Sequence, residues 1–167
     1  MEIGATKAVQ DRLKTTKIEE SKGASLVFCW DTHLTKIKGR NVLFIVNASN
    51  RYTIAMTDIE QGNWNYYTMY ISRVIHGVMQ EMGYSEDQIG QYFKMSGDTT
   101  VTKTHGRKSV GGINRMVMDA QYFGKKLEKE AKYQWELSEY LNRDICQPEG
   151  FDAYGYPSEL FKLDMER

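Results

Sequence analysis

The pattern of hydrophobic and polar residues from Trp30 to Met56 predicts three β-strands joined by two tight turns. In the first strand, Trp30 and Leu34 fall on one face, and polar residues fall on the other. The middle strand, Val42 to Val46, is apolar on both faces, so other elements must cover both of its sides. We therefore expect this antiparallel meander to be the centre of the fold.

Helical periodicity follows the meander. One apolar stripe between Asp58 and Gly83 predicts the main helix, and a second predicts a long helix from Val110 to about Ala131, capped by Ser109. Glycine in a helical first turn costs about 1 kcal/mol against alanine, so the pair at Gly111 and Gly112 indicates close packing or approach of a ligand. Shorter helices are expected at Thr6 to Lys14, from Ser85 to Met95 with a capping box to Gln88, near Gln134 to Leu141, and from Pro157 to Met165.

Two further strands and a loop complete the expected fold. Met1 to Ile3 could add a short edge strand, and the β-branched run from Thr99 to Thr104 predicts another strand at or near an edge. The polar stretch from Thr15 to Gly23 is interpreted as a mobile loop. The fold class expected is thus α+β, a single domain over residues 1–167 in which an antiparallel sheet of four to five strands packs with two long and several short helices.

Composition narrows the functions that this fold can serve. Lys plus Arg equals Asp plus Glu at 22 each, so the molecule has no excess positive charge to attract nucleic acid at long range. Cys29 and Cys146 form no short metal-ligand pair and are interpreted as reduced thiols of a cytoplasmic protein. The aliphatic run VLFIV is too short to cross a bilayer. We expect no membrane association, no cofactor and no metal.

The segment from Thr104 to Ser109 is a basic loop that leads into a helix start. Helix N-termini favour anions, and Arg107 and Lys108 would add positive charge. From Lys103 to Lys126, six Lys or Arg stand against one Asp, a local charge of about +5. The segment could contact a phosphate, a nucleic acid or an acidic protein, or it could be a solvated loop whose serine only caps the helix.

The signals for catalysis are weaker. Asp31 and His33 lie on one strand face and could form an acid–base or metal pair, but they need a third partner. The sequence contains no HxxxH, CxxC or HExxH spacing and no GxSxG motif, so structural roles for the histidines are favoured over metal ligation. Asn47, Asn50 and Arg51 occupy a turn, for which a structural role is the simpler interpretation.

The chain resembles a family of uncharacterised prokaryotic proteins classed as a domain of unknown function. The likeness rests on TKAVQDRLK near the start, YGYPSEL near the end, and Trp30, Asn47, Arg51, Tyr52, Lys108, Ser109, Val110, Gly111, Ile113 and Asn114. The sequence departs from that pattern at Asp31 and His33, and its Ser-Val-Gly segment is one residue shorter. The resemblance implies a shared fold and a shared site formed by the turn from Asn47 to Tyr52 and the segment from Lys108 to Asn114. It names no substrate.

These observations favour binding over catalysis. Our hypothesis is a non-enzymatic binding or regulatory protein, bacterial or phage-borne, that acts on a larger protein or complex. The first alternative is nucleic-acid binding through residues 103–126, and the second is a small enzyme that uses Asp31 and His33. Exposed aromatics such as Tyr66, Tyr70 or Trp135 would serve a protein partner. The predicted binding residues are Arg107, Lys108, Ser109, Asn114, Arg115, Asn47, Arg51, Tyr52 and Trp30.

Overall fold

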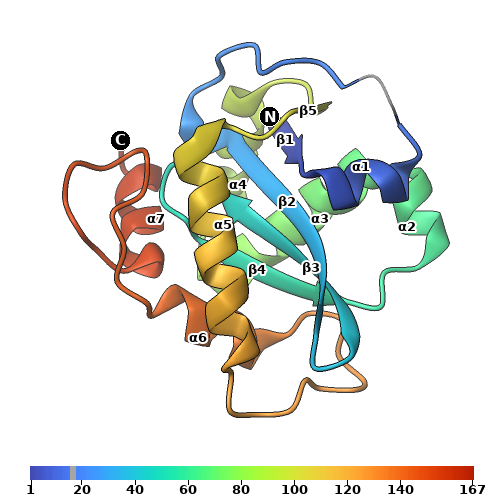
Figure 1. Ribbon diagram of the computed structural model, residues 1–167. Helices are drawn as coiled ribbons and strands as arrows, with labels where there is room; N and C mark the ends of the chain where they lie inside the picture. Colours follow the sequence, from blue (N-terminus) through green and yellow to red (C-terminus); the bar gives the residue numbers. More distant parts are fainter. Residues whose placement is uncertain (16–17) are drawn as a thin grey trace.

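A computed structural model describes residues 1–15 and 18–167. Its five-stranded sheet has the order β4-β3-β2-β1-β5, and helices cover both faces (Figure 1). The strands are β1 (Glu2–Ala5), β2 (Cys29–Ile37), β3 (Arg40–Asn47), β4 (Thr53–Thr57) and β5 (Thr100–Thr102). The fold is therefore α+β, as predicted.

The predicted meander is confirmed as the antiparallel strands β2, β3 and β4. The β2–β3 turn has positive φ angles at Lys38 (49°) and Gly39 (82°), a left-handed conformation that glycine favours. β3 is buried on both faces, as its apolar pattern indicates. Leu43 and Ile45 belong to one hydrophobic cluster, whereas Val42 and Phe44 belong to the other.

The prediction of an antiparallel sheet is wrong for β1 and β5. β1 is an interior strand that pairs in parallel with both β2 and β5, so the sheet is mixed. Parallel neighbours are joined by long crossovers, and a four-residue segment such as EIGA carries no signal for its pairing partner. β5 is an edge strand, as expected.

Seven helices lie within the described residues. They are α1 (Lys7–Leu13), α2 (Gln61–Asn65), α3 (Tyr67–Glu81), α4 (Glu86–Ser96), α5 (Gly106–Gln121), α6 (Trp135–Asn142) and α7 (Pro157–Met165), and Leu26–Phe28 form a short 3₁₀ helix. The capping box of Ser85 and Gln88 is present at the start of α4. Pro157 opens α7, as predicted.

The predicted bounds of two helices are wrong. The helix expected from Asp58 to Gly83 is divided into α2 and α3 at Tyr66, whose φ of −116° and ψ of 45° are not helical. The helix expected from Val110 to Ala131 begins at Gly106 and ends at Gln121. Phe123 and Leu127 lie after the end of α5 but are still buried in the same hydrophobic cluster. Their positions therefore matched the spacing of a helical apolar stripe although they are not helical.

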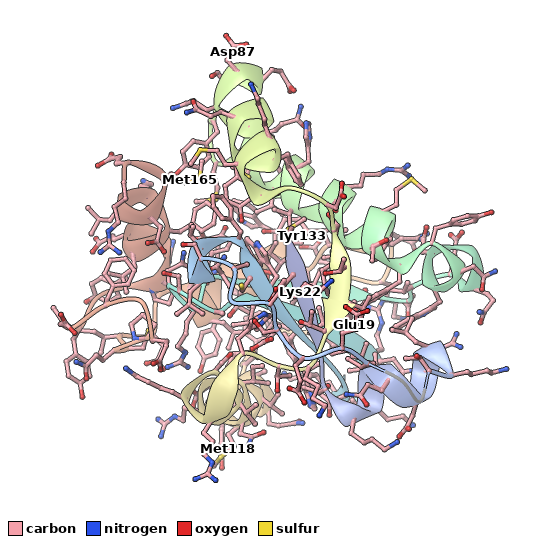
Figure 2. The ribbon with its side chains drawn as sticks, turned by 90° about the horizontal axis from the view of Figure 1, so that it is seen from above. Glu19, Lys22, Asp87, Met118, Tyr133 and Met165 are labelled. Carbon is pink, nitrogen blue, oxygen red and sulfur yellow. The ribbon has the colours of Figure 1, made fainter. Side chains whose placement is uncertain are left out.

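The sheet lies between two helical layers (Figures 1 and 2). On one face, Leu43 and Ile45 pack with Ile71 and Ile75 of α3. On the other face, Val42, Phe44 and Val46 pack with Ile113 and Met116 of α5, and with Leu137 and Leu141 of α6. Asp31 and His33 pair with Val46 and Phe44 in the β2–β3 register, so their side chains point toward α5.

The predicted loop from Thr15 to Gly23 lies partly outside the described residues, which exclude residues 16 and 17. Within its described part, Glu19 forms an isolated bridge with Thr102 of β5. No helix in the described part of the chain is both long and apolar enough to cross a membrane.

Candidate functional site

Three of the predicted site residues are buried and hold the fold together. The Trp30 indole donates a hydrogen bond to the Tyr92 hydroxyl (2.9 Å), and the Tyr52 ring lies 5.1 Å from that of Phe161. The Asn47 side-chain oxygen accepts from the Ser49 backbone N–H (2.9 Å), which fixes the turn after β3. Because these side chains are buried, a ligand cannot reach them at the surface.

The two segments suggested by the family resemblance do come together. Arg51, at a φ of 64°, donates from Nη2 to the Gly112 carbonyl oxygen (3.1 Å). A Cβ at position 112 would lie 3.0 Å from Arg51 Nε. The absence of a side chain at Gly112 therefore leaves room for the arginine. Close packing explains this glycine of the pair Gly111 and Gly112.

Ser109 does not cap a helix, contrary to prediction. The helix begins earlier, at Gly106, with His105 as the N-cap residue. Ser109 is one turn inside α5, where its buried hydroxyl donates to Oδ2 of Asp31.

Asp31 is paired with His105 and not with His33. His105 Nδ1 lies 2.7 Å from Asp31 Oδ1, and the His105 backbone N–H lies 3.2 Å from both carboxylate oxygens. His33 instead contacts the Thr6 hydroxyl through Nδ1 (3.1 Å), and burial lowers its pKa. The expected pair of Asp31 and His33 is therefore not formed, and the histidine that contacts Asp31 comes from the start of α5.

The other side of the His105 ring faces a second carboxylate. Nε2 lies 3.1 Å from Oε2 of Glu2, whose Oε1 accepts from the Lys22 backbone N–H (2.8 Å). We call the side chains that meet here the buried cluster: Glu2, Cys29, Asp31, His105 and Ser109.

The parallel pairing of β1 and β2 assembles the buried cluster. Glu2 is the register partner of Cys29, and Gly4 is the partner of Asp31, so all four positions share the face toward α5. A Cβ on Gly4 would lie 1.8 Å from Asp31 Oδ1. Gly4 thus provides the space that the carboxylate occupies.

Opposite charges meet inside this cluster. Burial disfavours the imidazolium, but hydrogen bonding to Asp31 and Cys29 raises the pKa of His105 to about 10. Burial acts against ionisation of Glu2, but hydrogen bonds from Ser21, Lys22 and His105 together hold its pKa below the usual value. At neutral pH a charged His105 therefore lies between carboxylates.

The burial of this cluster argues against direct catalysis. The side chains of Asp31, His105 and Glu2 are 0%, 3% and 6% exposed, so a substrate cannot contact them. Ligand atoms of Glu2, Cys29 and His105 lie within 4.8 Å of one another, which is close enough for all three to share a metal ion.

The remaining predicted residues on α5 point outward. Arg107, Asn114 and Arg115 are exposed. Met118 and Tyr122 extend the same face and are 60% and 80% exposed. Figure 2 shows Met118 on the outer rim of α5, away from the sheet. The outer stripe of α5 is defined as Arg107, Gly111, Asn114, Arg115, Met118 and Tyr122.

A pocket of about 590 Å³ lies where α5 meets α6. The α5–α6 pocket is lined by Asp119, Phe123, Lys125, Trp135, Glu136, Glu139, Tyr140, Leu141, Arg143 and Asp144. Trp135 and Tyr140 are 43% and 41% exposed, so their rings are accessible. Four carboxylates face two cations, and both cations are paired, Lys125 with Glu136 (2.7 Å) and Arg143 with Glu139 (2.6 Å).

The sequence pointed to this pocket only through Trp135, named as one exposed aromatic among three. Tyr66 is also exposed (67%), but Tyr70 is buried, contrary to prediction. A signal was available in the stretch from Trp135 to Asp144, which contains two aromatic and three acidic residues. Most of that stretch forms α6 (Trp135–Asn142), so several of these side chains lie on one side of the helix.

The basic residues of the predicted nucleic-acid surface are largely paired. Arg115 Nε lies 3.2 Å from Asp119, Lys125 Nζ lies 2.7 Å from Glu136, and Lys108 Nζ lies 4.0 Å from Glu149. Each carboxylate offsets a positive charge that a phosphate would need.

A protein-family model matches most of the chain. The model described as "Domain of unknown function (DUF6933)" matches residues 2–160, which include β1, the meander, α5 and the α5–α6 pocket. Searches of curated proteins and of solved structures found no match.

Proposed function

The chain belongs to the DUF6933 family, and we propose that it is a non-enzymatic protein-binding module. Its partner docks on the outer stripe of α5 and inserts a basic side chain, arginine or lysine, into the α5–α6 pocket. The observation that carries this proposal is the combination of accessible aromatic rings and excess carboxylates in one pocket. Binding of this kind suits the regulation of a larger protein or complex.

The chemistry of the pocket selects a cation. The faces of Trp and Tyr rings attract a cationic group by about 0.5–2 kcal/mol, according to how far it is desolvated. Trp135 and Tyr140 supply such rings beside the carboxylates of Asp119 and Asp144. Asp119 is also paired with Arg115 (3.2 Å), so an incoming arginine or lysine would complement Asp144 and share Asp119 with Arg115.

The outer stripe of α5 supplies the surrounding contact area. Arginine, methionine and aromatic residues are enriched at protein interfaces. Met118 and Tyr122 expose large apolar surface next to Asp119, which lines the pocket. The stripe and the pocket are thus continuous along the last turns of α5.

The experiment is a peptide-display screen on the immobilised protein. The enriched peptides are resynthesised with each arginine replaced by citrulline and each lysine by norleucine. We expect the neutral peptides to bind about tenfold more weakly, because the corresponding ~1.4 kcal/mol lies within the range for a desolvated cation on an aromatic ring. The Trp135→Ala variant should show the same loss, whereas Tyr154→Ala, which removes an exposed ring (71%) that does not line the pocket, should bind normally.

Two results would contradict the proposal. One is a screen that enriches no peptide. The other is enrichment of peptides that bind equally well after their basic residues are made neutral. If labelled DNA or RNA bound instead, with an affinity that fell steeply with salt and was lost in an Arg107→Ala, Lys108→Ala variant, the nucleic-acid alternative would replace the proposal.

A further inference from the structure

We propose that Glu2, Cys29 and His105 bind a single Zn²⁺ ion in the buried cluster. Zinc in proteins is bound by thiolate, imidazole and carboxylate groups, and these three side chains offer one of each. Their ligand atoms lie within 4.8 Å of one another. This site is separate from the α5–α6 pocket and does not depend on the proposed protein binding.

The distance between two of the ligand atoms suits a tetrahedral ion. Bonds of about 2.0–2.1 Å to nitrogen and oxygen place two such ligands about 3.3–3.4 Å apart across a tetrahedral edge. His105 Nε2 and Glu2 Oε2 are already 3.1 Å apart. Cys29 is the register partner of Glu2 on the adjacent strand, so its sulfur completes a third corner. The fourth position is left for a water molecule.

The groups behind the ligands resemble those that support zinc. A metal-bound histidine commonly donates its second ring N–H to a carboxylate, which fixes the ring and increases its basicity. Here Asp31 Oδ1 lies 2.7 Å from His105 Nδ1, while Ser109 donates to the other Asp31 oxygen. Nε2 is thereby directed toward Glu2 and Cys29, where the ion would bind.

The segment before β2 covers the site. The backbone N–H of Lys22 donates to Glu2 Oε1 (2.8 Å), and the carbonyl oxygens of Ala24 and Ser25 lie 3.7 and 3.5 Å from Cys29 Sγ. Figure 2 shows Glu19 and Lys22 beside β5.

Binding of the ion would release the Cys29 thiol proton and the Nε2 proton of His105, so the ion replaces two protons without any change of oxidation state. A bound ion would then join β1, β2 and the start of α5.

The test is a zinc titration of the whole chain in reducing buffer, after treatment with a chelator. We expect one Zn²⁺ per chain and a higher melting temperature in its presence. Cys29→Ser should weaken zinc binding by about tenfold or more. Loss of a residue that only supports a metal ligand already lowers affinity by about tenfold, and loss of a ligand itself should cost at least as much. Cys146→Ser is the matched control, because that buried cysteine lies outside the cluster, and it should bind zinc as the wild type does.

Cobalt supplies a readout of the ligands themselves. Co²⁺ bound through Cys29 gives a sulfur-to-metal charge-transfer band in the near ultraviolet, which should be present in the wild type and in Cys146→Ser but lost in Cys29→Ser. If Cys29→Ser does not fold, Glu2→Gln takes its place in the titration. Absence of zinc binding in the wild type, or a band that survives Cys29→Ser, would overturn the proposal and leave the cluster as a proton-bridged ion pair.

Discussion

The two ends of α5 both carry ionisable groups, but they use them in opposite ways. At its start, His105 and Ser109 point inward and meet Asp31 and Glu2 beneath the helix. At its end, the partly exposed Asp119 lines the pocket that also contains Lys125. The first end fastens the helix to β1 and β2, and the second leaves charge accessible to a partner.

The difference in burial sets the expected energetics. Removing one partner of a buried ion pair costs about 3–5 kcal/mol, because the other charge is left uncompensated. An exposed pair contributes only about 0–1 kcal/mol, because water screens it. Substitutions at the start of α5 should therefore reduce stability, whereas those at its end should leave stability almost unchanged and affect binding.

The largest effect is expected for Asp31→Asn. The substitution keeps the shape but removes the charge opposite His105, so the free energy of unfolding should fall by about 3–5 kcal/mol. Chemical denaturation of the metal-free protein measures this. Asp11→Asn is the control, because its pair with Lys7 is exposed, and it should stay within about 0.5 kcal/mol of the wild type. Similar values for the two variants would remove the distinction between buried and exposed pairs.

Gly4→Ala should have the next largest effect. The new methyl group would meet the Asp31 carboxylate, and such overpacking costs about 1–3 kcal/mol. Gly90→Ala is the control, because it makes the same substitution at an exposed position of α4 where a Cβ would meet no other atom. It should increase the free energy of unfolding by about 0.5–1 kcal/mol. Thermal unfolding of both variants tests this. A Gly4→Ala variant as stable as the wild type would show that Asp31 can move away.

Ser109→Ala should cost about 1–2 kcal/mol, because the buried Asp31 carboxylate loses a hydroxyl donor. Alanine favours the helix itself, so the loss measures the tertiary contact and not the propensity of α5. Denaturation of Ser109→Ala beside Ser158→Ala, a serine near the start of α7, separates the two contributions. If Ser109→Ala were the more stable variant, the hydroxyl would not be holding Asp31.

The smallest effect on stability is expected at the far end of α5. Arg115→Ala removes an exposed pair with Asp119 and should change the free energy of unfolding by less than about 0.5 kcal/mol. It also frees a carboxylate that lines the pocket, so a single arginine derivative, which tests the pocket without the outer stripe, should bind the variant at least as tightly as the wild type. Denaturation and a titration with N-acetyl-arginine methylamide check both statements. Weaker binding of this derivative would contradict a role for Asp119 in holding the cation.

The parts of the fold that sequence predicted are those with a local cause. The apolar run Val42 to Val46 requires cover on both faces, Ser85 and Gln88 form a cap from neighbouring residues, and Pro157 fits only a helix start. Each signal lies within a few positions of the structure that it specifies.

The parts that sequence missed depend on contacts between distant segments. Nothing near Glu2 indicates that Cys29 is its neighbour, because the parallel pairing of β1 with β2 spans the whole of α1 and the loop after it. A second distant contact sets the start of α5. His105 binds Asp31 of β2, so the helix begins there and not at the position favoured by the capping preference of Ser109. Of the nine predicted binding residues, those on the outer stripe of α5 are placed where a partner could reach them.

The most direct test of the account is an NMR titration with N-acetyl-arginine methylamide, followed at the indole N–H signals of the three tryptophans. Trp30 and Trp64 are buried and serve as internal references, whereas Trp135 lines the α5–α6 pocket. We predict a saturable shift of the Trp135 signal alone, with weak affinity of about 1 mM, and no such shift with the neutral citrulline analogue. An unchanged Trp135 signal, or an equal response to citrulline, would contradict binding of a cationic side chain in this pocket.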